Sequence, residues 1–216
     1  MFVANRMTAN PVTVSPDTSI IDAAHIMLRK KFRRLPVVEN GKLVGFFTDR
    51  DLMRVSPSPA TSLSKFEVLD LLTKLKVSEI MHRDAPTVRD DATIEEAALI
   101  MYQKKVDALP VLSEIGAVVG VITATDIMKT LIDMMGLPKG TTRITLEVEN
   151  KIGVVRDIAE VFTSGGLNID SLITCAQPDG RYEIIVRGNF PPKITGEVES
   201  KLESKGYKII HSVRIE

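Results

Sequence analysis

Two short stretches of the sequence place a hydroxyl group and a carboxylate at the same spacing. Thr48 stands three residues before Asp51, and Thr123 stands three residues before Asp126. A glycine and two bulky apolar residues precede each threonine, which predicts a buried strand that leads into a helix. One role for these residues is structural, because a threonine can cap a helix and an acid three residues later can complete a capping box. The other is ligand binding: the helix N-terminus and the hydroxyl suit a phosphate, and the carboxylate suits a ribose.

A cluster of basic residues supplies positive charge near the first of these stretches. Arg33 and Arg34 stand directly before the apolar run 35–38, and Arg50 lies between Thr48 and Asp51. Arginine can bind a phosphate group through two parallel hydrogen bonds. The alternative is a solvated helix end, because cations are favoured at the C-terminus of the helix predicted for residues 20–31. The sequence leaves both alternatives open.

The chain also contains an internal repeat. Met7 corresponds to Met81, and the run Leu-Pro-Val at 35–37 returns at 109–111. Such matches along one offset predict a duplicated structural unit. Each copy combines a predicted helix (20–31 in the first) with a hairpin, and the hairpin of the first copy turns at Asn40-Gly41. We further expect a short strand at residues 11–14 and a helix at 65–76 between the copies.

The second copy lacks the arginines of the first. Asp107 stands at the position of Arg33, and Thr125 stands at the position of Arg50. We therefore predict that an anionic phosphate binds beside Thr48 and Asp51, although copies that face each other allow the arginines to serve either motif.

The order of these motifs resembles a CBS domain, and two such domains in tandem resemble a Bateman module. The resemblance rests on Met-Thr followed by Pro-Val-Thr-Val (7–14), the Leu-Pro-Val-Val run (35–38) and the Gly-x-x-Thr-x-x-Asp stretch (45–51). It implies that each copy is a small β-α-β-β-α unit and that the paired copies leave two clefts. It also implies that these clefts bind AMP, ADP, ATP or S-adenosylmethionine. The nucleotide-binding residues that we expect are Val12, Arg33, Arg34, Thr48, Arg50, Asp51, Thr123 and Asp126.

The last third of the chain predicts a third unit. Alternating apolar residues predict strands, and apolar residues at helical spacing predict two helices, in the order β-α-β-β-α-β of a ferredoxin-like fold. This part resembles an ACT domain, on the turn 150–155 and the strand start 166–169. The resemblance implies an effector site at Asn150, Ile152, Gly153 and Asn168. A role in dimerisation alone is the alternative, because a fold does not imply a function.

The predicted fold class is therefore α+β: a tandem CBS pair followed by a ferredoxin-like ACT domain. We expect the first copy at residues 1–60, a helical linker at 61–77, the second copy at 78–136 and the ACT domain at 141–216.

Composition excludes several other classes of protein. The net charge of zero argues against non-specific binding to nucleic acid, and no apolar run predicts a membrane span. Cys175 is the only cysteine, which fits a reduced, cytoplasmic setting. The three histidines show no metal-ligand spacing, so no metal site is expected. The assigned units leave no stretch for a catalytic domain, so we expect no enzyme and no catalytic cofactor.

The whole layout resembles the AcuB-type acetoin-utilisation proteins, which implies a regulatory role in bacterial carbon metabolism. We expect a non-catalytic sensor of an adenine nucleotide or adenosine derivative that acts on an unidentified partner protein. A dimerising scaffold without a ligand and a sensor of the S-adenosylmethionine type are the alternatives. The apolar face at Met134 and Met135, together with the ACT unit, predicts a homodimer.

Overall fold

The computed structural model describes residues 1–55, 64–137 and 141–214, and it divides into two compact units, Met1–Ile127 and Met128–Glu216. The predicted boundary at 60/61 lies outside the described residues, and so does most of the predicted gap between 136 and 141.

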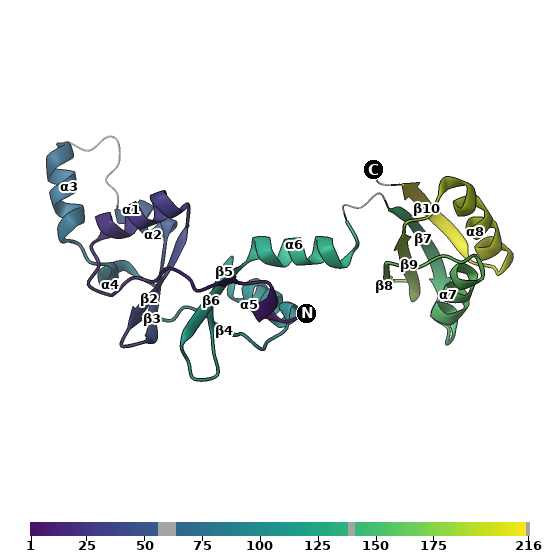
Figure 1. The fold of residues 1–216 in the computed structure, drawn as a ribbon, viewed down its shortest axis with the longest axis horizontal. Helices are drawn as coiled ribbons and strands as arrows, with labels where there is room; N and C mark the ends of the chain where they lie inside the picture. The colour runs from purple at the N-terminus through teal and green to yellow at the C-terminus, as the bar shows by residue number, and fades with distance from the viewer. Residues whose placement is uncertain (56–63, 138–140, 215–216) are drawn as a thin grey trace. The chain divides into compact units, whose positions relative to one another are not determined.

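The two sequence copies lie in the first unit as far as Ile127, and their elements follow one another in nearly the same order (Figure 1). The first copy comprises η1 Val3–Asn5, β1 Thr8–Ala9, α1 Ile20–Lys30, β2 Arg34–Glu39, β3 Lys42–Thr48 and α2 Asp49–Val55. Two helices, α3 Lys65–Lys74 and α4 Val77–Ile80, lie between the copies in the sequence. The second copy comprises β4 Val88–Arg89, α5 Ile94–Lys104, β5 Ala108–Leu112, β6 Val118–Thr123 and α6 Ala124–Met134.

Local sequence explains the main elements of each copy. Ser19 caps α1 and Thr93 caps α5, each by accepting a hydrogen bond from the backbone N–H three residues later. Both long helices end at a lysine in the left-handed conformation, Lys31 and Lys105. The hairpins β2–β3 and β5–β6 are antiparallel and carry a register shift at the same place in each copy. The predicted repeat is therefore visible in the backbone itself.

One predicted strand is wrong. Residues 11–14 do not form a strand, and only Val14 makes an isolated parallel bridge, to Val37. Pro11, Val12 and Thr13 do not pair with a neighbouring strand. Pro11 has no N–H group, so it cannot donate a hydrogen bond to a strand ladder. The pairing that the sequence did not indicate is that of β1, which lies antiparallel to β6 of the other copy.

The two copies exchange their leading segments, which we call the first arm (residues 1–12) and the second arm (residues 77–86). Val3 of the first arm is fully buried in the core of the second copy, and Val77 of the second arm is fully buried in the core of the first. A Cβ atom at Gly120 would collide with the side chain of Met7, and one at Gly45 would collide with that of Met81. Each copy is thus completed by the arm that belongs to the other.

The second unit has the predicted β-α-β-β-α-β order. Its elements are β7 Thr142–Glu149, α7 Val154–Ser164, β8 Ser171–Ala176, β9 Arg181–Gly188, α8 Pro192–Ser204 and β10 Lys208–Arg214. The strands form one antiparallel sheet in the order β10-β7-β9-β8. Strand β8 begins later than predicted, at Ser171, because residues 167–169 lie in the loop that follows α7.

Both helices of this unit cover the same face of the sheet (Figure 1). Ile144, Leu146 and Val186 of the sheet are fully buried in one apolar core with Phe162 of α7 and Leu202 of α8. Because side chains alternate along a strand, the odd-numbered residues of β7 and β9 point to the other face. No helix or strand of residues 141–214 covers that face in Figure 1.

Candidate nucleotide-binding clefts

Each Thr-Asp motif forms a closed hydrogen-bonded cap at the start of a helix. Thr48 donates its N–H and its hydroxyl to Asp51 Oδ2 at 2.9 and 2.7 Å, and the Asp51 N–H donates to Thr48 Oγ1 at 3.3 Å. Thr123 and Asp126 repeat this arrangement at 2.8, 2.7 and 3.3 Å. The capping role that the spacing allowed is therefore present in both copies. It leaves one oxygen of each carboxylate, Oδ1, outside the cap.

A cavity of about 390 Å³ lies in front of the first motif, and we call it the Thr48 cleft. Its walls come from the first copy, from the second arm and from the segment before β5. The lining residues are Arg34, Phe46, Thr48, Asp49, Arg50, Asp51, Arg54, His82, Asp84, Ala85, Pro86, Lys105, Val106, Asp107 and Ala108.

A second cavity, of about 240 Å³, lies at the corresponding place in front of the second motif, and we call it the Thr123 cleft. The lining residues are Thr8, Pro11, Val12, Lys31, Phe32, Arg33, Arg34, Val121 and Thr123. All nine occupy positions that the repeat relates to a residue of the Thr48 cleft, for example Thr8 to His82 and Arg33 to Asp107.

The positive charge is distributed differently from the prediction. Arg50 lines the Thr48 cleft as expected, but Arg33 lines only the Thr123 cleft, so its assignment beside Thr48 and Asp51 is wrong. The physical reason is the facing arrangement of the copies, which puts the segment before β2 opposite the motif of the other copy. Arg34 lines both clefts. Val12, whose cleft the sequence did not specify, lines the Thr123 cleft.

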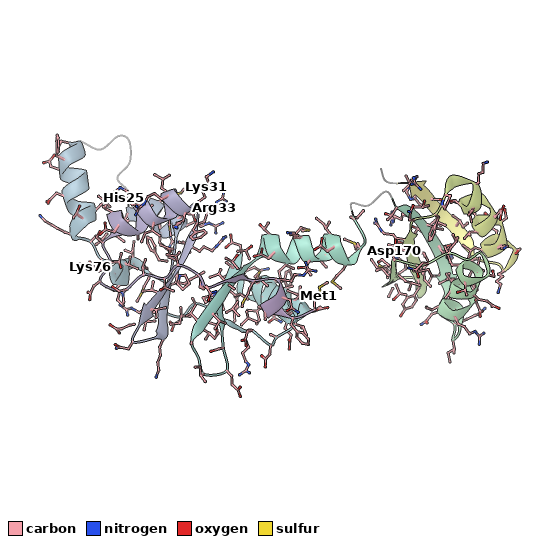
Figure 2. All side chains as sticks on the ribbon, in the orientation of Figure 1. Met1, His25, Lys31, Arg33, Lys76 and Asp170 are labelled. Atoms are coloured by element: carbon pink, nitrogen blue, oxygen red, sulfur yellow. The ribbon has the colours of Figure 1, made fainter. Side chains whose placement is uncertain are left out.

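Charges in the two clefts differ as a result. The Thr123 cleft is lined by Lys31, Arg33 and Arg34, with no carboxylate among its lining residues. Figure 2 shows Lys31 and Arg33 close together at the end of α1. The Thr48 cleft carries four cations (Arg34, Arg50, Arg54 and Lys105) and four carboxylates (Asp49, Asp51, Asp84 and Asp107). Moreover, Arg34 forms an ion pair with Asp107. Phosphate groups are therefore matched better by the Thr123 cleft.

The side chain of His82 contacts the carboxylate of Asp51, the group that the sequence analysis expected to bind ribose. His82 Nε2 lies 3.0 Å from Asp51 Oδ1, the oxygen that the cap leaves over. The Asp51 side chain is only 2% exposed, whereas the His82 side chain is 54% exposed. A ribose hydroxyl at Asp51 Oδ1 would therefore compete with His82 for this oxygen. In the other copy the residue at this position is Thr8, which has no ring nitrogen.

Sequence reasoning missed several residues of both clefts, among them Lys31, His82, Lys105 and Asp84. The repeat offset contained a signal for them, since Lys31 corresponds to Lys105 and Thr8 corresponds to His82. That signal becomes useful only when the exchange of the arms is known.

The residues expected at an effector site in the second unit are only partly brought together. Asn150 and Gly153 line a hollow of about 310 Å³ with Val154 and Tyr182. Ile152 is fully exposed and lines a neighbouring hollow, and Asn168 is not among the lining residues of either. Hydrogen bonding to Lys151 lowers the pKa of Glu149, which lines both hollows.

Among the described residues, no group of three or more His, Cys, Asp or Glu side chains could hold a metal ion. No helix in the same ranges is long and apolar enough to cross a membrane.

Several known proteins are similar to part of this chain. A CBS domain-containing protein of Dictyostelium discoideum is 34% identical over 136 residues, which are 62% of this chain and 94% of that protein. The inosine-5'-monophosphate dehydrogenase of Aquifex aeolicus is 35% identical over 125 residues, 57% of this chain but only 23% of the enzyme. The chain thus spans nearly all of the first relative and about a quarter of the second.

Solved structures are also similar to part of this chain. The crystal structure of a putative acetoin utilization protein (AcuB) from Vibrio cholerae matches with a TM-score of 0.52 and 30% identity, over 63% of this chain and 94% of that one. A CBS domain pair in complex with 5'-methylthioadenosine and S-adenosyl-L-methionine matches with a TM-score of 0.51 and 26% identity, over 61% and 95%. The AMP complex of a CBS-pair protein of Arabidopsis thaliana matches at 0.50 and 28%, over 61% and 96%.

The family model of the CBS domain matches twice, at residues 3–58 and 77–133, which together are just over half of the chain. The two matched stretches contain the two Thr-Asp caps, the two hairpins and most of the two exchanged arms described above. The chain belongs to the CBS-domain family and carries a tandem CBS pair.

Proposed function

We propose that this protein is a non-catalytic regulatory sensor that binds an adenine nucleotide or adenosine derivative in its CBS clefts. The observation that carries the proposal is the Thr123 cleft, where three cations surround a cavity at the N-terminus of α6. Free N–H groups and the positive end of a helix dipole favour a phosphate at such a place. The AMP, 5'-methylthioadenosine and S-adenosyl-L-methionine complexes of similar CBS pairs support this class of ligand.

The charges of the two clefts suggest a division between ligands. The phosphates of AMP, ADP or ATP bind in the Thr123 cleft, near Lys31, Arg33 and Arg34. The Thr48 cleft, where carboxylates balance the cations, takes a ligand with less negative charge, such as S-adenosylmethionine or adenosine. In each cleft the motif aspartate, Asp51 or Asp126, accepts hydrogen bonds from the ribose, and Val12 contacts the ligand in the Thr123 cleft.

The second unit is proposed to be an ACT domain that makes the protein a homodimer or binds a second small effector near Asn150, Ile152, Gly153 and Asn168. Similarity of 63% of this chain to the AcuB structure supports a role in the regulation of acetoin utilisation through a partner protein in the cytoplasm. No turnover of ATP is expected from the chain itself, and ATP hydrolysis abolished by a point mutation would contradict this.

Thermal unfolding with a panel of AMP, ADP, ATP, S-adenosylmethionine and adenosine tests the proposal. A ligand at a hundred times its dissociation constant stabilises a protein by about 2.7 kcal/mol, which raises the melting temperature by several degrees. The same panel with Arg33→Ala should lose the shift for the nucleotides and keep it for adenosine. A chain whose melting temperature responds to no member of the panel would instead be the scaffold without a ligand.

A further inference from the structure

Buried polar atoms without a partner lie on the sheet of the second unit, on the face that α7 and α8 leave uncovered. Among the described residues, the buried side-chain nitrogen and oxygen atoms without a hydrogen-bond partner are Thr141 Oγ1, Arg143 Nε, Thr145 Oγ1, and Nε and Nη1 of Arg187. Buried polar groups are normally paired, because leaving one unpaired costs free energy. Thr145 and Arg187 lie in the same sheet as Ile144 and Val186, but they point away from the core that those two residues join.

The register of the sheet arranges this face in rows. Arg143 of β7 lies opposite Arg187 of β9, Thr145 lies opposite Ile185, and Glu147 lies opposite Glu183. Going along the strands, a basic row is thus followed by a neutral row and then by an acidic row. Like charges directly opposite each other on neighbouring strands are destabilising.

The basic row has no counter-charge within the described residues, since neither Arg143 nor Arg187 forms an ion pair there. Arg187 is only 8% exposed. Burial and the charge of Arg143 both lower the pKa of Arg187. In the acidic row, Glu147 is paired with Arg181 at 2.6 Å and with Lys208 at 3.0 Å, whereas Glu183 forms no ion pair with any residue that the structure describes. The basic row therefore lacks a counter-charge, and the acidic row contains one carboxylate, Glu183, that makes no ion pair within the described residues.

We propose that a second copy of this chain packs against this face, sheet to sheet, about a two-fold axis that runs along the neutral row. This inference names the surface of the homodimer proposed above and rests on that part of the proposed function. A two-fold axis perpendicular to the strands places the acidic row of one copy over the basic row of its partner. Glu183 then lies over the Arg187 position and supplies its missing counter-charge, and the second copy receives the same contact.

Charge selects this axis over the other face-to-face arrangement. An axis parallel to the strands would place the two basic rows on each other, and like charges juxtaposed across an interface cost several kcal/mol. The neutral row supplies apolar contact at the centre: Ile185 and its neighbour Ile173 on β8 are both half-buried in the single chain. Sheets that pack in this way lie about 10 Å apart.

Cross-linking of the full-length chain tests the arrangement directly. Cys175 lies on the same face, so it is first replaced, Cys175→Ser, and Ile185→Cys is then introduced on the axis. A bismaleimide about 10 Å long should join two copies through this position, because the spacing of the sheets matches its length. Thr174→Cys, whose side chain is exposed and belongs to the alternate set of β8, is the matched control and should give little cross-linked dimer.

Charge reversal shows whether the acidic row meets the basic row. Glu183→Arg leaves the buried arginines untouched and should lower the yield of cross-linked dimer about tenfold or more. Adding Arg187→Glu should restore the yield, because the pair is then reversed in both copies. Circular dichroism and thermal melting of each variant confirm that it is folded. A Glu183→Arg variant that cross-links like its parent, or a dimer that does not cross-link at position 185, would overturn the proposal.

A small anion is the competing occupant. A chain that stays monomeric in light scattering, and whose melting temperature rises with millimolar inorganic phosphate only while Arg187 is present, would exclude the second copy. The nucleotide panel is run on Glu183→Arg in parallel. A retained nucleotide response with a lost dimer supports both proposals, and an absent response with an intact cross-link overturns nucleotide sensing alone.

Discussion

The Thr48 cleft and the Thr123 cleft have the same backbone plan, but the first is lined by balanced charges and the second by cations alone. Each has a Thr-Asp cap at a helix start and an arm from the other copy. The segment before β2 contributes Lys31 and Arg33 to the Thr123 cleft, and the segment before β5 contributes Lys105 and Asp107 to the Thr48 cleft.

This difference shows how a duplicated fold can acquire two specificities. The motif that caps the helix stays the same because the helix needs it in both copies. The residues that set the charge lie on the facing segment, where they can change without loss of the cap. Substitutions in the two clefts should therefore have different effects on ligand binding.

The largest effect is expected for Arg33→Ala, which removes a guanidinium group from the Thr123 cleft. A hydrogen bond to a charged partner contributes about 1.5–3 kcal/mol, so ADP should bind about 10- to 150-fold more weakly. Titration calorimetry with ADP and with adenosine measures this. Asp107→Ala, at the corresponding position of the Thr48 cleft, is the control and should not lower the affinity for ADP. An equal loss of adenosine binding in Arg33→Ala would contradict the assignment of phosphate to this cleft.

A smaller effect is expected for Asp51→Ala and for Asp126→Ala, each of which removes a carboxylate that is proposed to accept hydrogen bonds from the ribose. A ribose at Asp51 competes with His82 for the same oxygen, which reduces the net gain from that contact. We expect each variant to bind its ligand about tenfold more weakly. Asp107, which stands at the position of Arg33 in the second copy, lines the cleft of Asp51.

Both of these substitutions also break a helix cap, so each should lower the free energy of unfolding by about 1 kcal/mol. Calorimetry paired with a melting curve separates the two roles. Reduced stability with unchanged affinity would show that the aspartates act only as caps.

His82→Ala should strengthen ligand binding in the Thr48 cleft. The variant removes the group that lies 3.0 Å from Asp51 Oδ1, and a net hydrogen bond of about 0.5–1.5 kcal/mol corresponds to about 2- to 13-fold in affinity. S-adenosylmethionine or adenosine is titrated into both proteins. Thr8→Ala is the matched variant of the other cleft, where no gain is expected. Weaker binding in His82→Ala would mean that His82 contacts the ligand instead of competing with it.

The smallest effect concerns the first turn of α5, where Glu96 accepts hydrogen bonds from the Thr93 N–H at 2.7 Å and from the Thr93 hydroxyl at 2.9 Å. These bonds lower the pKa of Glu96 in the folded chain. The stabilisation is therefore present above the unfolded pKa, about 4.3, and is lost as the pH falls through the lower folded value. Glu96→Gln should flatten the fall in stability between about pH 5 and pH 3.

Urea unfolding across this pH range measures the effect, with Glu95→Gln as the control from the same helical turn. A larger change in the control than in Glu96→Gln would show that the general charge of the turn, and not the bonds to Thr93, determines the profile.

Much of the local structure followed from sequence alone. The spacing of Thr48 and Asp51 predicted a cap at a strand-to-helix junction, and both caps are present with matching hydrogen bonds. Asn40-Gly41 predicted the first hairpin turn, and both residues have positive φ. These features depend on interactions between residues that are close together in the chain, so the local sequence is enough to predict them. The strand predicted at residues 11–14 was wrong because strand pairing depends on residues far along the chain. Of these four residues, only Val14 makes a bridge, to Val37.

What the sequence by itself determined is the tandem CBS pair, its duplicated helices and hairpins, the capping role of each Thr-Asp motif and the β-α-β-β-α-β order of the second unit. What only the tertiary structure decided is which residues meet. Arg33 lies three residues after the end of α1 in the first copy, yet it lines the cleft of the second copy. Likewise, nothing in the local pattern placed His82 on Asp51 or Arg143 opposite Arg187. The physical reason is that charge acts through space, and the exchange of the arms and the register of the sheet bring together residues that are far apart along the chain.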